Sequence, residues 1–319
     1  MMQFTGNNGK QAELASGTAG DVLDALGMKK GAIAAKIDGC AVDLSRVVER
    51  GGEAAPILPE SDEGLDILRH SAAHLMAQAV AQMYPGTRYG VGPAIKDGFY
   101  YDMEIPGGIT EEDLPKIEKE MHRIAKRSVP VERRVLSKAE ALEWFKAKND
   151  PYKVEIISEL EDETVTLYVQ GEYADLCRGP HVPNTSYVRH FKLLSVAGAY
   201  WRGDEKNIML TRVYGTAFGD EESLAAYIHR MEEAKNRDHR RLGKELDLFS
   251  LQAEGPGFPF FHPKGMVILN NLMDFWKKEH TKRGYCEIRT PLILERSLWI
   301  QSGHWDHYRD NMYFTEIDE

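Results

Sequence analysis

Two histidines four residues apart, His70 and His74, stand in the segment DILRHSAAHL with two alanines in the gap. Side chains at this spacing lie about one turn apart on the same face of a helix. The two imidazoles are therefore expected to act together. A zinc-protease helix would carry glutamate directly after its first histidine, whereas position 71 is serine, so that motif is excluded.

A second group of reactive side chains lies further along the chain, in the segment DLCRGPH. It holds Cys177 and His181, with Asp175 two positions ahead of the cysteine. The Gly-Pro step predicts a loop, and loops commonly display reactive groups on a scaffold. Three imidazoles and one thiol suit tetrahedral zinc. The same atoms suit a metal-free hydrolytic site, where an imidazole moves protons and Asp175 orients a ring or a water, so both alternatives stay open.

A helix must carry the histidine pair. Ser61, followed by Asp62 and Glu63, predicts the helix start, because serine caps free N–H groups and acids favour the N-terminal end. Apolar residues recur at helical spacing and predict a core stripe over Leu65, Leu68, Ala72, Leu75, Ala79 and Met83. The histidines fall on the other side, where Ala77 and Ala81 are expected to leave room for a partner.

The remaining elements around the site follow from turn and capping signals. Asp97-Gly98 predicts a hairpin turn into an aromatic strand, and Ser137 with Glu140 forms a capping box for a helix that stops at Pro151. After a strand that alternates through Val169, the chain is expected to become a loop. Periodicity further predicts a helix over 110–127, a strand over 191–201 and one long connecting helix over 221–242.

The N-terminal residues predict a separate small module. A short helix near 19–27 and short strands after it indicate an α+β fold. The stretch RGGEAAPILPESDEG has the Gly, Pro and acidic composition of a linker. The first domain boundary is therefore expected near residue 61.

Composition bounds the class of protein. The chain has 319 residues, of which 42% are hydrophobic and 28% charged, which suits several soluble domains. No apolar run approaches the ~18 residues of a membrane span, and three cysteines cannot all pair, so a reducing cytoplasm is expected. A net charge of −10 argues against a surface that coats nucleic acid. Any RNA contact is expected from local basic residues, namely Lys235, Arg237, Arg240 and Arg241.

Three segments together carry a family resemblance: RHSAAHLMAQAV, GVGPAIKDGFYYD and DLCRGPHVPNT. They resemble the editing domain of bacterial-type threonyl-tRNA synthetases, which is shared with alanyl-tRNA synthetases. The N-terminal module resembles the ubiquitin-like TGS domain, the segment from Glu245 resembles the start of a class II catalytic domain, and SGHWDHYRDNMY is typical of threonyl enzymes. The resemblance implies an α+β multidomain chain whose parts are TGS (1–61), editing (62–220), linker helix (221–242) and class II (243–319).

The resemblance also implies a site and an activity. His70, His74, Cys177 and His181 would line an editing pocket with Asp175 beside them, and Lys153 in DPYKVEII matches a lysine of that pocket. Serine differs from threonine by one methyl group, which a pocket discriminates by only about 1 to 3 kcal/mol, so synthetases use a second, hydrolytic sieve.

The expected reaction is hydrolysis of seryl-tRNA(Thr). An imidazole or Lys153 would activate water, Asp175 would hold substrate or water, and Cys177 would shape the pocket. Editing in the threonyl branch is expected to be metal-free. Zinc, as in the alanyl relatives, is the alternative, and its ligands would be His70, His74, Cys177 and His181.

The full-length family implies further partners and cofactors: tRNA(Thr), threonine or serine, ATP, magnesium and one zinc. The arginines that bind ATP and the catalytic zinc ligands belong to later motifs, and His304 and His307 are not assigned to them. Motif 1, whose helix and strand lie around Pro291, implies a homodimer. The chain is therefore expected to be the N-terminal half of a longer synthetase, without ligase activity of its own. A freestanding editing hydrolase and a noncatalytic TGS-containing RNA-binding regulator are the alternatives.

Overall fold

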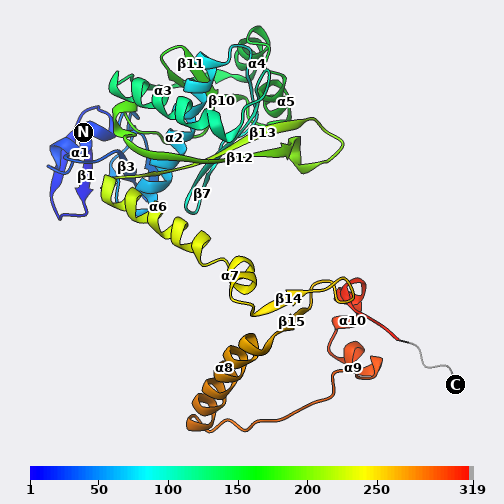
Figure 1. The fold of residues 1–319 in the computed structure, drawn as a ribbon. Coiled ribbons are helices and arrows are strands. Elements are labelled where there is room, and N and C mark those ends of the chain that lie inside the picture. Colours follow the sequence, from blue (N-terminus) through cyan, green and yellow to red (C-terminus); the bar gives the residue numbers. More distant parts are fainter. Residues whose placement is uncertain (316–319) are drawn as a thin grey trace. The chain divides into compact units, whose positions relative to one another are not determined.

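The computed structural model describes residues 1–315, and the chain divides into two units, Met1–Glu232 and Glu233–Glu319 (Figure 1). Helices and several sheets occur together in the first unit. The α+β class predicted from the sequence is confirmed. None of the helices among these residues is both long and apolar enough to cross a bilayer.

The N-terminal module is a five-stranded sheet in the order β2-β1-β5-β3-β4, packed on one helix. Phe4, Leu23 and Leu26 are almost completely buried in its core. The helix predicted near 19–27 is confirmed as α1. The elements of the module are β1 (Met2–Gly6), β2 (Gln11–Leu14), α1 (Ala19–Ala25), β3 (Ala34–Ile37), β4 (Cys40–Val42) and β5 (Gly52–Ile57).

The linker predicted from the Gly, Pro and acidic residues before position 61 is wrong in its first half, because that segment forms β5. This strand pairs with β1 in parallel and with β3 antiparallel. Ala54 and Ile57 are buried on it. Composition indicated a loop, but the paired backbone and two buried side chains make this the central strand of the sheet.

A long helix, α2 (Asp62–Met83), runs through the core of the next domain. It begins where predicted, since the Ser61 side chain accepts a hydrogen bond from the Gly64 N–H. A sheet in the order β12-β13-β8-β6 and helix α3 pack against it. These elements are β6 (Arg88–Tyr89), β7 (Ala94–Ile95, paired with β8), β8 (Gly98–Glu104), α3 (Leu114–Lys126), β12 (His190–Tyr200) and β13 (Met209–Phe218).

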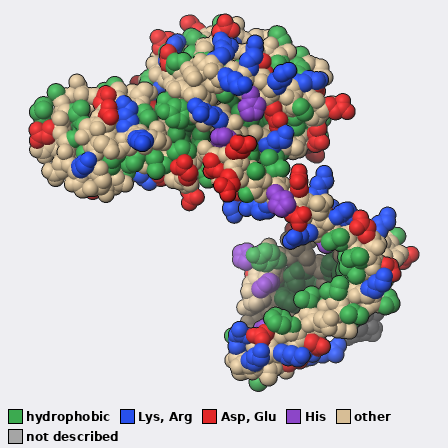
Figure 2. Space-filling model, turned by 60° about the vertical axis from the view of Figure 1, so that its left-hand side comes forward, with side chains coloured by type: hydrophobic (Ala, Val, Ile, Leu, Met, Phe, Trp, Pro, Cys, Tyr) green, Lys and Arg blue, Asp and Glu red, His purple; other side chains and the backbone are tan. Residues whose placement is uncertain are grey.

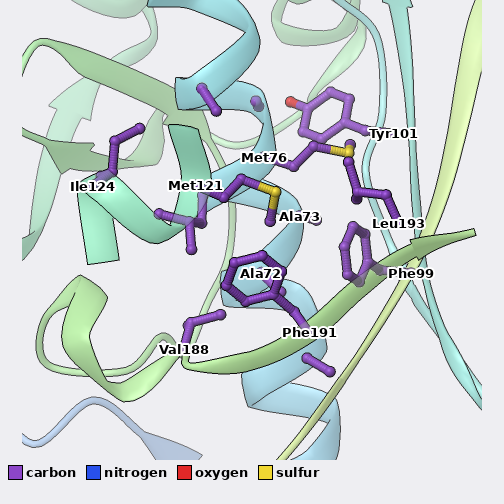
Figure 3. Packing of buried hydrophobic residues seen from close by; sticks show 14 of the residues in the cluster. Ala72, Ala73, Met76, Phe99, Tyr101, Met121, Ile124, Val188, Phe191 and Leu193 are labelled. Carbon is purple, nitrogen blue, oxygen red and sulfur yellow. The ribbon is translucent and has the colours of Figure 1, made fainter. Parts of the chain in front are cut away.

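The core around α2 joins residues from helices and strands. Figure 3 shows Ala72, Ala73 and Met76 of α2 near Met121 of α3 and Phe191 of β12. Alanine at two of these positions lets the neighbouring side chains approach the helix backbone closely.

The burial of α2 differs from the one-sided stripe predicted for it. All residues from 71 to 80 are buried, so the histidine side of the helix is covered as well. The room expected beside Ala77 is absent, because Ala77 is buried and its carbonyl accepts a hydrogen bond from the Tyr89 hydroxyl. Ala81 borders a different cavity from the one that contains the histidines. Periodicity reports the apolar stripe of a helix, whereas coverage on the remaining side depends on elements far away in sequence.

A second sheet, in the order β11-β10-β9, carries the rest of the site. The Ser137 and Glu140 capping box is present at the start of α4, as predicted. Pro151 was expected only to stop a helix, but it also opens α5 after the Asp150 cap, as proline favours the first helical position. The elements are β9 (Val131–Ser137), α4 (Lys138–Ala147), α5 (Pro151–Glu159), β10 (Thr164–Gln170) and β11 (Tyr173–Leu176).

The single long helix predicted over 221–242 is wrong. The chain forms α6 (Glu221–Asn236) and α7 (His239–Glu245), and the Asp238 side chain caps α7. Aspartate at this position satisfies the first N–H groups of a new helix, which favours an interruption.

The second unit contains a hairpin of β14 (Phe249–Leu251) and β15 (Pro259–Phe261), followed by α8 (Pro263–Lys282), α9 (Arg296–Gln301) and α10 (His304–Tyr308). The strand expected around Pro291 is absent from the described part of the chain, where 285–295 is irregular. A strand needs a partner for its backbone groups, and no described residue pairs with this segment. The last four residues of the region predicted as 243–319 lie outside the described residues.

Apolar side chains remain uncovered in this second unit. Five of them have relative exposures between 45% and 69%: Phe258, Phe260, Phe261, Ile268 and Trp276. Figure 2 shows hydrophobic side chains on its surface.

Candidate active site

The two reactive motifs meet at one place. The donor atoms of His70 and His74 on α2, and of Cys177 and His181 on the loop after β11, all lie within 4.8 Å of one another. The Cys177 Sγ is 2.7 Å from the His70 Nε2 and 3.4 Å from the His181 Nε2. Residues separated by more than a hundred positions therefore form one cluster.

A buried ion pair adjoins this cluster. The Lys153 Nζ on α5 lies 2.5 Å from the Asp175 Oδ1, and the His74 Nε2 lies 3.5 Å from the Asp175 Oδ2. All three side chains are buried. Asp175 was expected in the loop with Cys177, but it belongs to β11, whose paired backbone holds the carboxylate more firmly than a loop would. All six residues predicted for the site are thus near one another.

Two tyrosines that no sequence motif predicted surround the ion pair. The Tyr101 hydroxyl donates a hydrogen bond to the Asp175 Oδ2 and accepts one from the Lys153 Nζ at 3.2 Å. The Tyr173 hydroxyl lies 3.5 Å from the Tyr101 hydroxyl. Tyr173 and Asp175 are two positions apart on β11, so strand alternation placed them on one face. Tyr101 gave no signal beyond its place in an aromatic strand.

Ser71, whose place directly after His70 excludes the zinc-protease motif, also belongs to the site. Its Oγ lies 3.1 Å from the His181 Nδ1 and accepts a hydrogen bond from the Val182 N–H at 3.2 Å. The serine hydroxyl thus fixes both the ring and the main chain at the end of the loop. No sequence pattern pairs position 71 with position 181.

A cavity of about 520 Å³ opens onto these groups, within the size range of small-molecule sites. Its polar lining comes in part from five predicted residues: His70, His74, Lys153, Asp175 and Cys177. His181 is 1% exposed and does not line the cavity. It therefore lies behind Cys177, where it supports the wall.

One wall of the cavity depends on a glycine. The segment Val91–Pro93 lines it, and a Cβ atom built on Gly92 would lie 2.3 Å from the Tyr101 ring. Only a residue without a side chain lets this segment approach the ring so closely.

Burial keeps the imidazoles of the site neutral near pH 7. It holds the pKa of His74 and of His181 well below the ordinary value of 6.5, and positive charge on the neighbouring histidines would lower both pKa values further. Burial also lowers the pKa of His70, although the Asp175 carboxylate opposes this effect. Neutral rings offer a free lone pair, which either a water proton or a metal ion can take.

The thiol and the tyrosine hydroxyls stay protonated in this environment. Burial raises the pKa of Cys177 to about 12, which opposes a role as nucleophile because the thiolate is the reactive form. Burial and the Asp175 carboxylate raise the pKa of Tyr101 and of Tyr173 well above 10.0. Both tyrosines are therefore hydrogen-bond donors at neutral pH.

The same cluster fits the donor set of zinc. Bond lengths of about 2.0–2.1 Å to nitrogen and about 2.3 Å to sulfur place tetrahedral ligand atoms about 3.5 Å apart, and the observed separations extend from 2.7 Å to 4.8 Å. The Nδ1 of His181 contacts Ser71, while its Nε2 faces the thiol. An outer hydrogen bond of this kind orients metal-binding histidines.

Comparison with known proteins agrees with the geometry. Residues 165–214 match the family described as the threonyl and alanyl tRNA synthetase second additional domain. This match spans most of β10, all of β11, the Cys177–His181 loop and β12. Threonine–tRNA ligases match far more of the chain. That of Carboxydothermus hydrogenoformans is 55% identical over 92% of this chain and 46% of its own length.

Two further relatives cover the chain completely. The threonine–tRNA ligase of Desulforamulus reducens is 50% identical over 100% of this chain and 51% of its own length, and that of Clostridium botulinum strain Loch Maree is 52% identical over the same shares. This chain is similar to threonine–tRNA ligases along its whole length. The family resemblance predicted from three short segments is confirmed. The chain spans about half the length of the curated relatives it matches.

Proposed function

We propose that this chain hydrolyses seryl-tRNA(Thr) as the editing part of a threonine–tRNA ligase. One observation carries the proposal: a single cavity presents two neutral imidazoles beside a buried lysine–aspartate pair. These groups suit ester hydrolysis, and the relatives at 50% identity or more are threonine–tRNA ligases. A threonine–tRNA ligase needs such a site to remove serine that has been attached to tRNA(Thr) in place of threonine.

In the proposed reaction, a water oxygen bonds to the carbonyl carbon of the seryl ester. His70 or His74, the two imidazoles that line the cavity, accepts the water proton. The ester bond to the ribose oxygen then breaks, and that oxygen takes up a proton. Lys153, which is held by Asp175 and Tyr101, would donate hydrogen bonds to the oxygen that becomes negative.

The other two predicted residues support the cavity. Cys177 carries a protonated thiol against His70 and would limit the space for the side chain of the amino acid. His181 would hold Cys177 from behind. Discrimination then requires the cavity to accept serine and to exclude the extra methyl group of threonine.

Deacylation by the purified chain tests this proposal. Seryl-tRNA(Thr) should be hydrolysed faster than threonyl-tRNA(Thr), and His74→Ala and Lys153→Ala should each lose most of the activity. His122→Ala is a matched control, since His122 stacks on Phe191 outside the cavity. Unchanged hydrolysis in both site variants would remove the proposed roles. Tight tRNA binding without hydrolysis would instead support the RNA-binding alternative.

A zinc-dependent form of the same hydrolysis is the second candidate, because four donors of the right types lie within 4.8 Å of one another. His70, His74, Cys177 and His181 would hold the ion, which would supply an activated water. Metal analysis of the purified chain and deacylation after chelation separate the two candidates. Full activity without zinc supports the metal-free reaction.

The domain assignments and the activity of the whole enzyme are proposed from the similarity to threonine–tRNA ligases. We assign residues 1–61 to a TGS domain, 62–220 to the editing domain, 221–242 to a linker and 243–319 to the start of a class II catalytic domain. The whole enzyme would join threonine to tRNA(Thr) with ATP, magnesium and one catalytic zinc, and would dimerise through the region around Pro291. The cytoplasm, where charged tRNA is used, is the proposed compartment, and none of the three cysteines is in a disulfide.

A further inference from the structure

A buried carboxylate of the N-terminal module reaches the loop of the candidate site. Asp43 follows β4 and is 8% exposed. Its Oδ1 accepts a hydrogen bond from the main-chain N–H of His181 at 2.8 Å, and its Oδ2 accepts one from the Tyr168 hydroxyl at 2.7 Å. Both partners belong to the next domain along the chain.

This carboxylate is held by hydrogen bonds rather than by an ion pair. No lysine, arginine or histidine among the described residues forms a salt bridge with Asp43, and both of its oxygens are used by the two neutral donors. Burial of a carboxylate is costly unless its hydrogen bonds are made. The two donors and the carboxylate therefore depend on one another.

Both donors bear directly on the reactive loop. His181 lies four residues after Cys177 and faces its Sγ. The Tyr168 ring on β10 packs against the His181 ring, with their centroids 4.4 Å apart. Burial, together with the facing Asp43 carboxylate, raises the pKa of the Tyr168 hydroxyl, so that the hydroxyl stays a donor.

The loop also passes unusually close to Tyr168. Gly179 has a φ of 70°, and a Cβ atom on it would lie 1.9 Å from the Tyr168 hydroxyl oxygen. The chain between Cys177 and His181 is thus confined by Tyr168 on one side and tied to Asp43 at its end.

We propose that Asp43 is a positioning residue of the hydrolytic site: through the His181 main chain and the Tyr168 hydroxyl, it holds the Cys177–His181 loop against the histidines of α2. The N-terminal module is accordingly part of the site rather than an independent appendage. The predicted effect of Asp43 on hydrolysis rests on the proposed function. The predicted effect of Asp43 on the Cys177–His181 loop can be measured without that function.

The chain offers a matched control for contact between the same two domains. Lys36 on β3 forms an ion pair with Glu63 at the start of α2, and Lys36→Ala removes this contact without touching the loop. Asp43→Ala removes both hydrogen bonds to the site. Asp43→Asn keeps an oxygen for the His181 N–H, and Tyr168→Phe removes only the second bond.

Two measurements on the full chain test the inference. The first is kcat and KM for seryl-tRNA(Thr). The second is the rate of Cys177 alkylation by iodoacetamide in a Cys40→Ser, Cys286→Ser background, since both of those cysteines are exposed. Asp43→Ala should lower kcat by about tenfold to 100-fold, because a displacement of about 1 Å can cost that much. KM should stay within about twofold, since tRNA binding elsewhere is unaffected.

Alkylation of Cys177 should be several times faster in Asp43→Ala, with smaller changes in the same direction for Asp43→Asn and Tyr168→Phe. Lys36→Ala should change neither quantity. Unchanged Cys177 reactivity in Asp43→Ala, or an equal change in Lys36→Ala, overturns the inference. Should Asp43→Ala fail to fold, the two milder variants decide by the same criteria. A wild-type chain that hydrolyses no aminoacyl-tRNA refutes the proposed function alone, because the alkylation comparison still applies.

Discussion

Replacing Lys153 by methionine tests how much the buried Lys153–Asp175 ion pair contributes to stability. The Lys153 and Asp175 side chains are 3% and 4% exposed and lie 2.5 Å apart. Methionine keeps most of the volume but leaves the carboxylate without its cation, beside Tyr101 and His74. Removing one partner of a buried pair costs about 3–5 kcal/mol, most of it from the uncompensated charge.

Urea unfolding followed by circular dichroism measures this cost. The single variants Lys153→Met and Asp175→Leu should each be destabilised by about 3–5 kcal/mol. The double variant should lose clearly less than the sum, because no lone charge remains, with a coupling energy of about 2 kcal/mol or more. Lys192→Met is a matched control, since Lys192 pairs with Glu118 at 3.0 Å but its side chain is 44% exposed. Its loss should stay below about 1 kcal/mol.

Two results would refute the reasoning. A loss for Lys153→Met no larger than that for Lys192→Met would mean that the buried pair is solvated in solution. Additive losses in the double variant would mean that Lys153 and Asp175 act independently, contrary to their contact. In either case, the ordering of Lys153 by Asp175 that the proposed reaction uses would have to be abandoned.

Two further outcomes follow from the site. The pKa values of His74 and His181 in the folded chain lie well below the unfolded value of 6.5, so the unfolded chain binds more protons between the two values. The free energy of unfolding should therefore fall as the pH drops from 7 to 5. His74→Gln should flatten the dependence of the urea midpoint on pH, and an unchanged profile in that variant would contradict the assignment. Gly92→Ala would place a methyl group 2.3 Å from the Tyr101 ring, so the wall must move at a cost of about 1–3 kcal/mol and deacylation should fall. Gly107→Ala is the control: its φ of 80° also strains the backbone, but it lies in an exposed turn that does not line the cavity, so deacylation should stay intact. Equal deacylation rates for Gly92→Ala and the wild type would show that this wall does not define the cavity.

The local signals in the sequence predicted the parts of the fold that are decided locally. Ser61 and the Ser137–Glu140 box identified two helix starts because capping involves residues only three positions apart. The strand at 191–201 was likewise identified as β12, and the hairpin predicted at Asp97-Gly98 forms one residue earlier, with Lys96 and Asp97 in the turn and Gly98 already in β8. The caps and the turn depend on neighbouring residues alone.

The features that the sequence did not reveal depend on contacts between distant segments. The complete burial of α2 requires a sheet and a helix from later in the chain, and β5 is recognisable as a strand only once β1 and β3 flank it. In the site, the spacing of His70 and His74 predicted one shared face. Tyr101, Ser71 and Asp43 could not be found in this way, because each meets its partner across more than 70 positions.

The Ser71 hydroxyl has a consequence for which form of His181 is present. Since its oxygen already accepts a hydrogen bond from the Val182 N–H, it retains one hydrogen to give and one lone pair to offer. Giving that hydrogen to the His181 Nδ1 leaves the ring proton on Nε2, toward the sulfur; accepting instead from Nδ1 frees Nε2 to coordinate an ion. Rotation about a single C–O bond, coupled to a tautomer change, therefore separates a metal-free site from one in which the His181 Nε2 can bind an ion.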